Sequence, residues 1–146
     1  MEHITLPNLF FQKALENSDK PFLWAKRNKE WKSLSWHETE IKVKQVAAGL
    51  KYHGIMPGDK IIIVSENRPE WIISDLAINT LNAITVPAYV TNTEDDHRYI
   101  IEHSDAKAVI VSDNIIANRI ALALSKVNSC KLLITMDEYS GFMPEG

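Results

Sequence analysis

The sequence is poor in the two residue types on which many short functional motifs depend. Cysteine occurs once, at Cys130, so no intramolecular disulfide can form and a reducing compartment is expected. We expect this side chain to be a small filler of the core. Glycine occurs only five times, and no glycine lies in a G-x-G-x-x-G or G-x-x-x-x-G-K pattern. The usual signatures of loops that bind dinucleotides or nucleoside triphosphates are therefore missing.

Long apolar runs and an excess of positive charge are also missing. No run approaches the roughly 20 apolar residues of a membrane-spanning helix. The first twelve residues lack a basic start and are interrupted by Pro7 and Asn8, so they do not form a signal peptide. The formal net charge of -3 disfavours binding to nucleic acid or to an anionic lipid surface. With 146 residues, 45% of them hydrophobic, the chain is expected to form one soluble, cytoplasmic domain.

Four short apolar runs, "IIIV", "ITV", "AVIV" and "LLIT", recur along the second half of the chain. They begin at Ile61, Ile84, Ala108 and Leu132, a spacing that accommodates a strand, a loop, a helix and a second loop. The runs are continuous rather than alternating, which is typical of parallel strands covered on both faces. The sequence therefore predicts an α/β fold, with a parallel sheet of about four strands and crossover helices on both faces.

The segments between these runs carry signals for helix starts and stops. Asn67 is expected to cap a helix with Pro69 in its first turn and Glu70 completing a capping box. That helix should end near Asn82, because asparagine tolerates the left-handed backbone of a helix end. The other expected starts are Ser35 with Glu38, Thr93 with Asp96, and Asp113 or Asn114.

The first part of the chain has a different pattern from the repeat that follows it. "NLFFQKALEN" predicts a short opening helix, and "PFLWAK" and "EWKSLSW" predict two strands joined by a turn at "RNKE". We therefore divide the single domain of residues 1–146 into an opening helix and hairpin (1–36), a βα repeat (37–137) and a tail (138–146).

Residues with obvious chemistry form few convincing groups. No two histidines have the i, i+4 spacing of paired metal ligands on a predicted helix, so no metal site is expected. Glu94, Asp95 and Asp96 fall in the first turn of a predicted helix, where the helix dipole favours negative charge. We interpret this acidic cluster as structural rather than as an acid/base pair. His53 is interpreted in the same way, as a group at a helix carboxyl end.

Two loops lie where open parallel sheets bind ligands, at the carboxyl ends of strands: "SENR" and "AYVTNT". Arg68 and Tyr89 in these loops are candidate ligand contacts. The alternative is that Arg68 pairs with Glu70 or a neighbouring loop and that Tyr89 packs on the next helix. Arg119 could also meet an anionic ligand, or be a solvated surface arginine. Ser65 lacks the G-x-S-x-G pattern of a nucleophile elbow. No catalytic, cofactor-binding or metal-binding residue is assigned.

The most specific stretches, "PGDKIIIVSENRPEW", "ITVPAYVTNT" and "YIIEHSDAKAVIV", resemble the amino-terminal part of AMP-forming acyl-CoA synthetases. The similarity is greatest to the long-chain fatty acid-CoA ligases and covers nearly the whole chain. Two positions depart from the pattern: Asn82, where the family has a small residue, and Val90, where a proline is usual. Both bear on the substrate more than on the fold.

The resemblance implies a parent enzyme that uses ATP and Mg to convert a fatty acid to an acyl-adenylate and then transfers the acyl group to coenzyme A. The family's phosphate loop, adenine-binding segment, ribose-binding acid and catalytic lysine have no counterpart in this sequence. The chain alone is therefore expected to be inactive and to hold no tightly bound cofactor. Its expected partners are the rest of the ligase or a second subunit, with self-association through exposed apolar faces. The alternatives are a freestanding, non-catalytic interaction domain and a ligase for a different acid.

Overall fold

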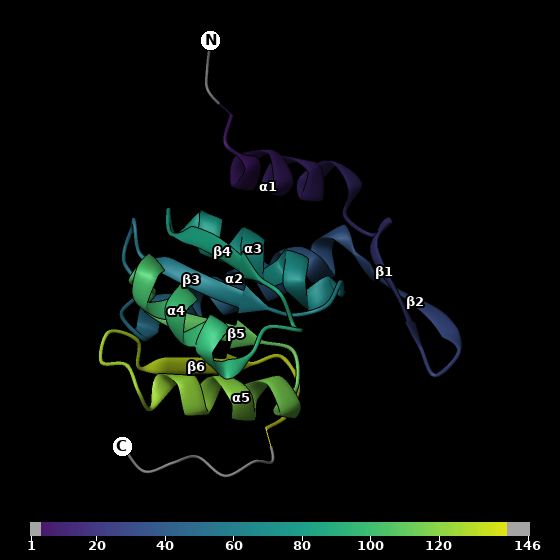
Figure 1. Ribbon diagram of the computed structural model, residues 1–146. Helices are drawn as coiled ribbons and strands as arrows, with labels where there is room; N and C mark the ends of the chain where they lie inside the picture. The colour runs from purple at the N-terminus through teal and green to yellow at the C-terminus, as the bar shows by residue number, and fades with distance from the viewer. Residues whose placement is uncertain (1–3, 140–146) are drawn as a thin grey trace.

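A four-stranded parallel sheet forms the centre of the molecule (Figure 1). The computed structural model describes residues 4–139. The strand order is β4-β3-β5-β6, so β3 and β5 are central, and the predicted parallel sheet is confirmed. Within the described residues the elements are α1 (Leu6–Asn17), β1 (Pro21–Arg27), β2 (Glu30–Ser35), α2 (Trp36–Tyr52), β3 (Lys60–Val64), α3 (Pro69–Thr80), β4 (Ile84–Ala88), α4 (Glu94–Ser104), β5 (Ala108–Val111), α5 (Asn114–Leu124) and β6 (Leu132–Thr135).

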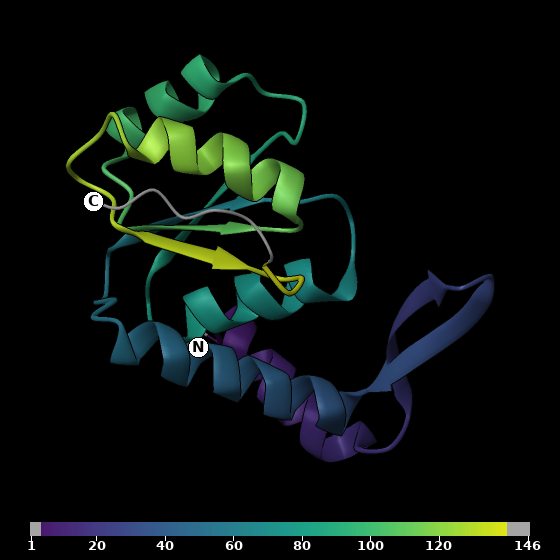
Figure 2. The ribbon, with the colours of Figure 1, turned by 90° about the horizontal axis from the view of Figure 1, so that it is seen from below.

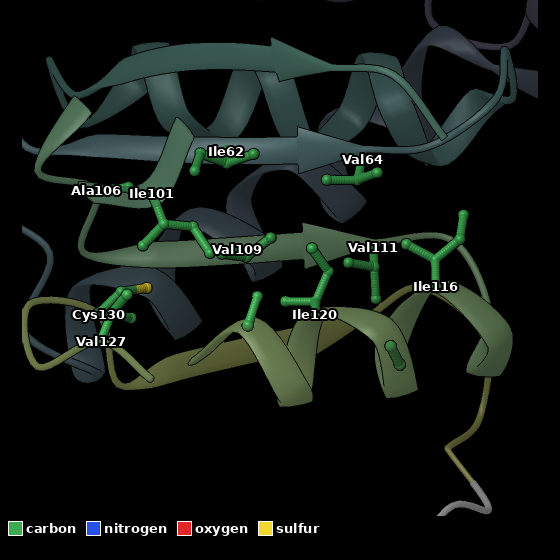
Figure 3. Packing of buried hydrophobic residues seen from close by; sticks show 12 residues of the cluster. Ile62, Val64, Ile101, Ala106, Val109, Val111, Ile116, Ile120, Val127 and Cys130 are labelled. Atoms are coloured by element: carbon green, nitrogen blue, oxygen red, sulfur yellow. The ribbon is translucent and has the colours of Figure 1, made fainter. Parts of the chain in front are cut away.

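Helices cover both faces of the sheet, as the continuous apolar runs predicted (Figure 2). On one face Ile62 and Val109 pack with Ile120 of α5 (Figure 3), and on the other Ile61 and Ile63 pack with residues of α2 and α3. The central strands are therefore buried on both sides. Cys130 is part of the first cluster and is 1% exposed, which confirms its expected place in the core. Burial raises the pKa of its thiol.

Two predicted capping boxes are present. At α2 the Glu38 amide donates to Ser35 Oγ at 3.1 Å, and the Ser35 amide donates to Glu38 Oε2 at 2.7 Å. At α4 the amides of Thr93 and Asp96 donate reciprocally to the two side chains. Each box satisfies backbone amides that have no partner inside the helix.

The start of α3 differs from the prediction by one residue. Arg68, not Asn67, is the N-cap, with an extended backbone and no side-chain capping bond. Pro69 is the first helical residue, and a proline forces its predecessor out of the helical conformation. The expected capping box is wrong, because the Glu70 carboxylate is bound by arginine side chains. At α5 the cap is Asp113, whose Oδ1 accepts from an amide of the first turn at 2.9 Å.

The end of α3 follows the prediction. The helix ends at Thr80, and Asn82 has a positive φ of 56°. The carbonyl of Asn82 accepts a bond of 2.8 Å from the amide of Gly58, in the turn that precedes β3. This contact joins the turns before the neighbouring strands β3 and β4.

The opening helix and the hairpin are both confirmed. Asn28 and Lys29 at the turn have φ values of 52° and 67°, as a two-residue hairpin loop requires. The base of the hairpin is packed, with the Phe22 ring stacked on Trp36 at a centroid distance of 3.8 Å. The tip extends away from the sheet and its helices (Figure 2). No helix within residues 4–139 has the length and apolar character needed to cross a membrane. Most of the expected tail, from residue 140 onward, lies outside the described residues.

Candidate functional site at the carboxyl edge of the sheet

The topology of the sheet marks one place where a ligand would be expected. From β3 the chain passes to β4 on one side, whereas β5 pairs with the other side of β3. The order reverses between β3 and β5, and open α/β sheets bind ligands outside the carboxyl ends of strands at such a switch point. Residues 65–68 follow β3 and Ser112 follows β5. The predicted loop "SENR" therefore lies at the switch point.

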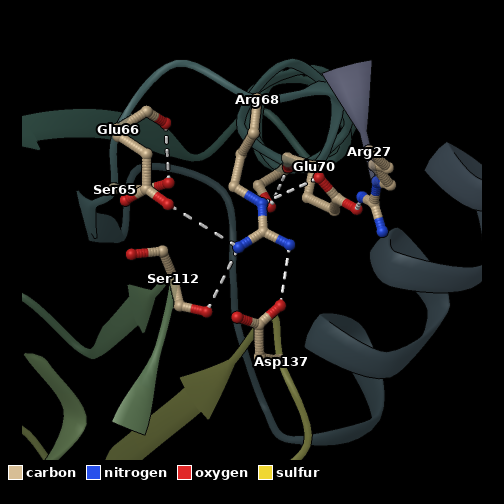
Figure 4. Close-up of polar contacts among 8 residues, drawn as sticks. Arg27, Ser65, Glu66, Arg68, Glu70, Ser112 and Asp137 are labelled. Carbon is tan, nitrogen blue, oxygen red and sulfur yellow. Dashed lines mark hydrogen bonds and ion pairs between the residues drawn. The ribbon is translucent and has the colours of Figure 1, made fainter. Parts of the chain in front are cut away.

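The Arg68 side chain lies at the switch point, where it makes hydrogen bonds and ion pairs to other residues of the chain (Figure 4). Its guanidinium donates to Asp137 Oδ1 at 2.7 Å, to Glu70 Oε2 at 2.8 Å and to the carbonyl of Ser112 at 3.4 Å. Glu66 lies further away, at 3.8 Å. The Arg68 side chain is only 16% exposed. It thus joins the loop after β3 to the ends of β5 and β6, which agrees with the structural alternative considered for this arginine.

Glu70 connects the same cluster to the hairpin, because its second carboxylate oxygen accepts a bond from Arg27. Burial raises the pKa of Glu70, but hydrogen bonds from Arg68, from its own backbone amide and from Arg27 lower it more, to about 2. The bonds to Asp137 and Glu70 raise the pKa of Arg68 above its ordinary value. Arg68 and Glu70 are therefore both charged at neutral pH.

Two serines at the switch point have different surroundings. Ser65 Oγ donates to the carbonyl of Glu66 at 2.8 Å, so its hydroxyl is engaged by the backbone. Ser112 is completely buried, and its Oγ has no hydrogen-bond partner among the described residues. A buried hydroxyl without a partner costs free energy. Neither serine is held by a base of the kind that nucleophilic catalysis requires.

The loop after β4 gives two corrections. Tyr89 is 80% exposed, so the expectation that it packs on the next helix is wrong. Arg119 is partly buried rather than solvated, and its Nη1 donates to the carbonyls of Val90 and Asn92 at 3.0 and 2.9 Å. Beside it, His97 is 1% exposed and its Nε2 has no partner among the described residues. Burial and the charge of Arg119 lower the pKa of His97.

The acidic cluster has the predicted structural role. Asp96 belongs to the capping box of α4, and the hydrogen bonds from Thr93 lower its pKa. Glu94 pairs with Lys126, and Asp95 lies 3.4 Å from Arg98 in the next turn. Within residues 4–139 no group of three His, Cys, Asp or Glu side chains could hold a metal ion. His53 is the C-cap of α2, in agreement with its interpretation.

The charges around Arg68 do not favour a polyphosphate ligand. At the switch point two guanidinium groups face three carboxylates, so a polyphosphate would meet a surplus of negative charge. The guanidinium of Arg68 is already bound on each side, and no glycine-rich loop is available to cradle phosphates. What the arrangement does is fix the relative positions of the strand ends and the hairpin.

Comparison with known proteins decides the family. The sequence model of the AMP-binding enzyme family matches residues 10–143. The chain belongs to this family. It is 27% identical over 120 residues to the long-chain-fatty-acid-CoA ligase FadD15 of Mycobacterium tuberculosis, covering 82% of this chain and 20% of that protein. With the long-chain-fatty-acid-CoA ligase 6 of Rattus norvegicus the identity is 30% over 146 residues, covering 95% of this chain and 19% of the relative.

Solved structures agree on the fold. A benzoate CoA ligase from Burkholderia xenovorans LB400 matches with a TM-score of 0.78 and 22% identity, over 88% of this chain and 25% of that one. The adenylation domain of a carboxylate reductase from Mycobacterium chelonae matches with a TM-score of 0.82 and 18% identity, over 95% and 24% of the two chains. The chain therefore spans about a fifth of the length of its curated relatives and a quarter of these structures.

Sequence reasoning considered the pairing of Arg68 with Glu70 but missed the bond from Arg68 to Asp137 and the carbonyls that Arg119 binds. Asp137 was given no role from the sequence. It accepts a hydrogen bond from Arg68 across a separation of 69 residues. His97 was not singled out either. Its position in the first turns of a helix, facing the sheet, gives no signal that distinguishes it from an exposed histidine. Such contacts depend on the crossing of distant segments, which spacing along the sequence does not report.

Proposed function

We propose that the chain is the amino-terminal subdomain of an ATP-dependent ligase that joins a long-chain fatty acid to coenzyme A. The observation that carries this proposal is the family match over residues 10–143, together with relatives that are named long-chain-fatty-acid-CoA ligases. A carboxylate is a poor acyl donor, so the parent enzyme first forms an acyl-adenylate and then the thioester. In this proposal ATP, Mg, CoA and the fatty acid bind to other parts of the enzyme.

In this proposal the role of the chain within the enzyme is structural. Residues 1–36 supply the opening helix and the hairpin, residues 37–137 the βα repeat, and residues 138–146 the tail. The Arg68 cluster ties these parts together at one edge of the sheet. Because the described residues lack a phosphate loop and a metal site, the isolated chain is expected to be inactive. The parent enzyme is proposed to act in the cytoplasm.

The experiment has two steps. The intact mass of the natural gene product is compared with the 16.6 kDa of this chain. The complete product and the isolated chain are then assayed for ATP/pyrophosphate exchange that depends on a long-chain fatty acid, with benzoate and a short-chain acid as controls. A larger product that exchanges only with the long-chain acid supports the proposal. Exchange by the purified isolated chain would refute its predicted inactivity, and preference for another acid would change the substrate.

A freestanding interaction domain is the second candidate, and one surface favours it. An apolar groove of about 280 Å³ lies between α1, the start of the hairpin and α3. Leu6, Leu9 and Ile72 on its rim are 58%, 42% and 38% exposed. Exposed apolar surface of this kind marks association sites. A natural product near 16.6 kDa that self-associates through this groove would support this candidate over the ligase.

A further inference from the structure

Within residues 4–139 the β1–β2 hairpin lacks a third strand. Its strands pair only with each other, and a two-stranded hairpin alone is at best marginally stable in water. The base is packed against the body, but residues 30–33 of β2 are all exposed. The tip of the hairpin extends beyond the helices in both ribbon views (Figures 1 and 2). Within residues 4–139 the outer half of β2 is therefore uncovered, whereas Arg27 at the outer end of β1 is bound to Glu70 of α3.

A cleft of about 710 Å³ lies along β1. One wall is formed by the consecutive residues 24–28, and the other includes residues 66–69 at the junction of β3 and α3. Side chains of consecutive strand residues point to opposite faces of the strand. Five consecutive residues can therefore line one cleft only if the cleft runs along the edge of the strand. The open edge of β1, with its unpaired backbone groups, therefore faces the loop that contains Arg68.

The side chains in the cleft suit an extended polypeptide. Trp24 and Trp31 are 54% and 66% exposed, and they share one face of the hairpin because Trp31 is paired with Lys26. Lys26 lies on that same face and makes no hydrogen bond or ion pair within the described part of the chain. An added strand would find backbone partners along the edge of β1, apolar contacts on the tryptophans and a free ammonium group.

We propose that an extended segment of the same enzyme's polypeptide, from outside residues 4–139, adds to the open edge of β1 as a third strand. This inference rests on the proposed function, in which the chain is part of a longer ligase. The curated relatives have about four fifths of their length outside the matched region. Asp137, just after β6, is bound to Arg68 on the opposite wall, so the carboxyl end of β6 lies close to the cleft. The segment carries apolar side chains toward the tryptophans and an acidic one toward Lys26.

The test uses the complete natural polypeptide, after its mass and its exchange activity are known. The photoreactive residue benzoylphenylalanine replaces Lys26 in one variant and Tyr52 in the control. Tyr52 lies at the end of α2, is 87% exposed and does not line the cleft. After irradiation, peptide mass spectrometry is expected to link position 26, but not position 52, to one segment outside residues 4–139, with no increase in total mass.

Amide hydrogen exchange at single-residue resolution tests the strand pairing itself. If both edges of β1 are paired, the amides of residues 23–27 all exchange slowly, including the alternate set that points away from β2. We expect this outward set to exchange at least about tenfold more slowly than the amides of the hairpin turn.

Several outcomes would overturn the strand addition. They are a link to a second copy or another protein, links from position 26 no more frequent than from position 52, or rapid exchange of the outward amides. Failure of the proposed function is distinguishable from these results. A product near 16.6 kDa removes both proposals. A long product with exchange activity but no link removes only the strand addition, and a long product with the link but no activity removes only the ligase.

Discussion

Replacing Arg68 with methionine is expected to destabilise the chain far more than replacing an arginine on an open helix face. Methionine keeps much of the length and packing of the side chain but cannot donate hydrogen bonds. Glu70 and Asp137 would lose bonds of 2.8 and 2.7 Å, and the Ser112 carbonyl would lose the more distant of its two donors, keeping the Asp137 amide. Because Arg68 is only 16% exposed, water replaces these contacts incompletely.

The magnitude follows from the exposure of each partner. A hydrogen bond to a charged group contributes about 1.5 to 3 kcal/mol when it is shielded from water. The Glu70 side chain is 29% exposed and retains most of this, about 2 kcal/mol. The Asp137 side chain is 49% exposed, so solvent screening reduces its share to about 1 kcal/mol. Together the substitution should lower the free energy of unfolding by about 3 kcal/mol.

Urea unfolding at pH 7, followed by tryptophan fluorescence, measures this change. With a slope of about 2 kcal/mol per molar urea, the midpoint should fall by about 1.5 M. The control is Arg98→Met, whose ion pair with Asp95 is exposed on both sides and should cost less than about 0.5 kcal/mol. Equal losses in the two variants would refute the reasoning. Asp137→Asn should cost less stability in the Arg68→Met variant than in the unchanged chain, because the effects of two residues in contact are not additive. An equal cost in both would also refute the reasoning.

The same cluster predicts a dependence on pH. The pKa of Glu70 is about 2 in the folded chain against an ordinary value of 4.5. Its contribution to stability is therefore complete above about 4.5 and is lost as the pH falls toward about 2. Arg68→Met should weaken this acid dependence. An unchanged slope of stability against pH in that range would contradict the assigned role of Arg68.

Three further predictions concern the other face of the sheet. Arg119→Met frees the carbonyls of Val90 and Asn92, so amide exchange in the loop after β4 should accelerate; unchanged exchange would show that the arginine does not hold it. His97→Leu should remove a loss of stability below about pH 6.5, because the lowered pKa of the buried histidine means that the unfolded chain binds the proton first. Urea unfolding of both proteins at pH 5 and pH 7 checks this. An equal change in the free energy of unfolding between the two pH values in both proteins would contradict it. Asp113→Ala removes the cap of α5 and should cost about 1 kcal/mol in a thermal melt, whereas Asp113→Asn, which keeps an oxygen that can cap the helix, should cost less.

The sheet and its helices could be predicted because their signals are local. Continuous apolar runs mark strands that are buried on both faces, and Ser35 with Glu38 or Thr93 with Asp96 fix helix starts within four residues. The order of the strands is not local in this sense. The prediction stopped at four parallel strands with crossovers and did not include the order β4-β3-β5-β6, from which the switch point follows.

The errors share a physical cause. Asn67 has the better capping side chain, but Pro69 forces its immediate predecessor to be the N-cap, and Glu70 is drawn to arginines. Tyr89 was expected to pack on a helix but is exposed, and Arg119 was expected to be solvated but is partly buried. At the start of α3 the neighbouring proline decides the cap, and at Arg119 the carbonyls of a distant loop decide the environment, so in both cases the surroundings outweigh the residue's own preference. The propensity of a residue describes its intrinsic conformational preference and does not predict which residues contact it in the folded chain.

At the switch point of the sheet, Arg68 occupies the position where open α/β sheets bind ligands. A crevice between two strand ends exposes backbone carbonyls and leaves room for a charged group, and the guanidinium meets both conditions. Once Arg68 is bound to Glu70 and Asp137, an anionic ligand would have to displace a carboxylate and then face those that remain. Using the crevice for structure also fixes the loop that forms one wall of the cleft beside β1. The edge that topology marks for a small ligand is thereby better suited to hold another part of the polypeptide.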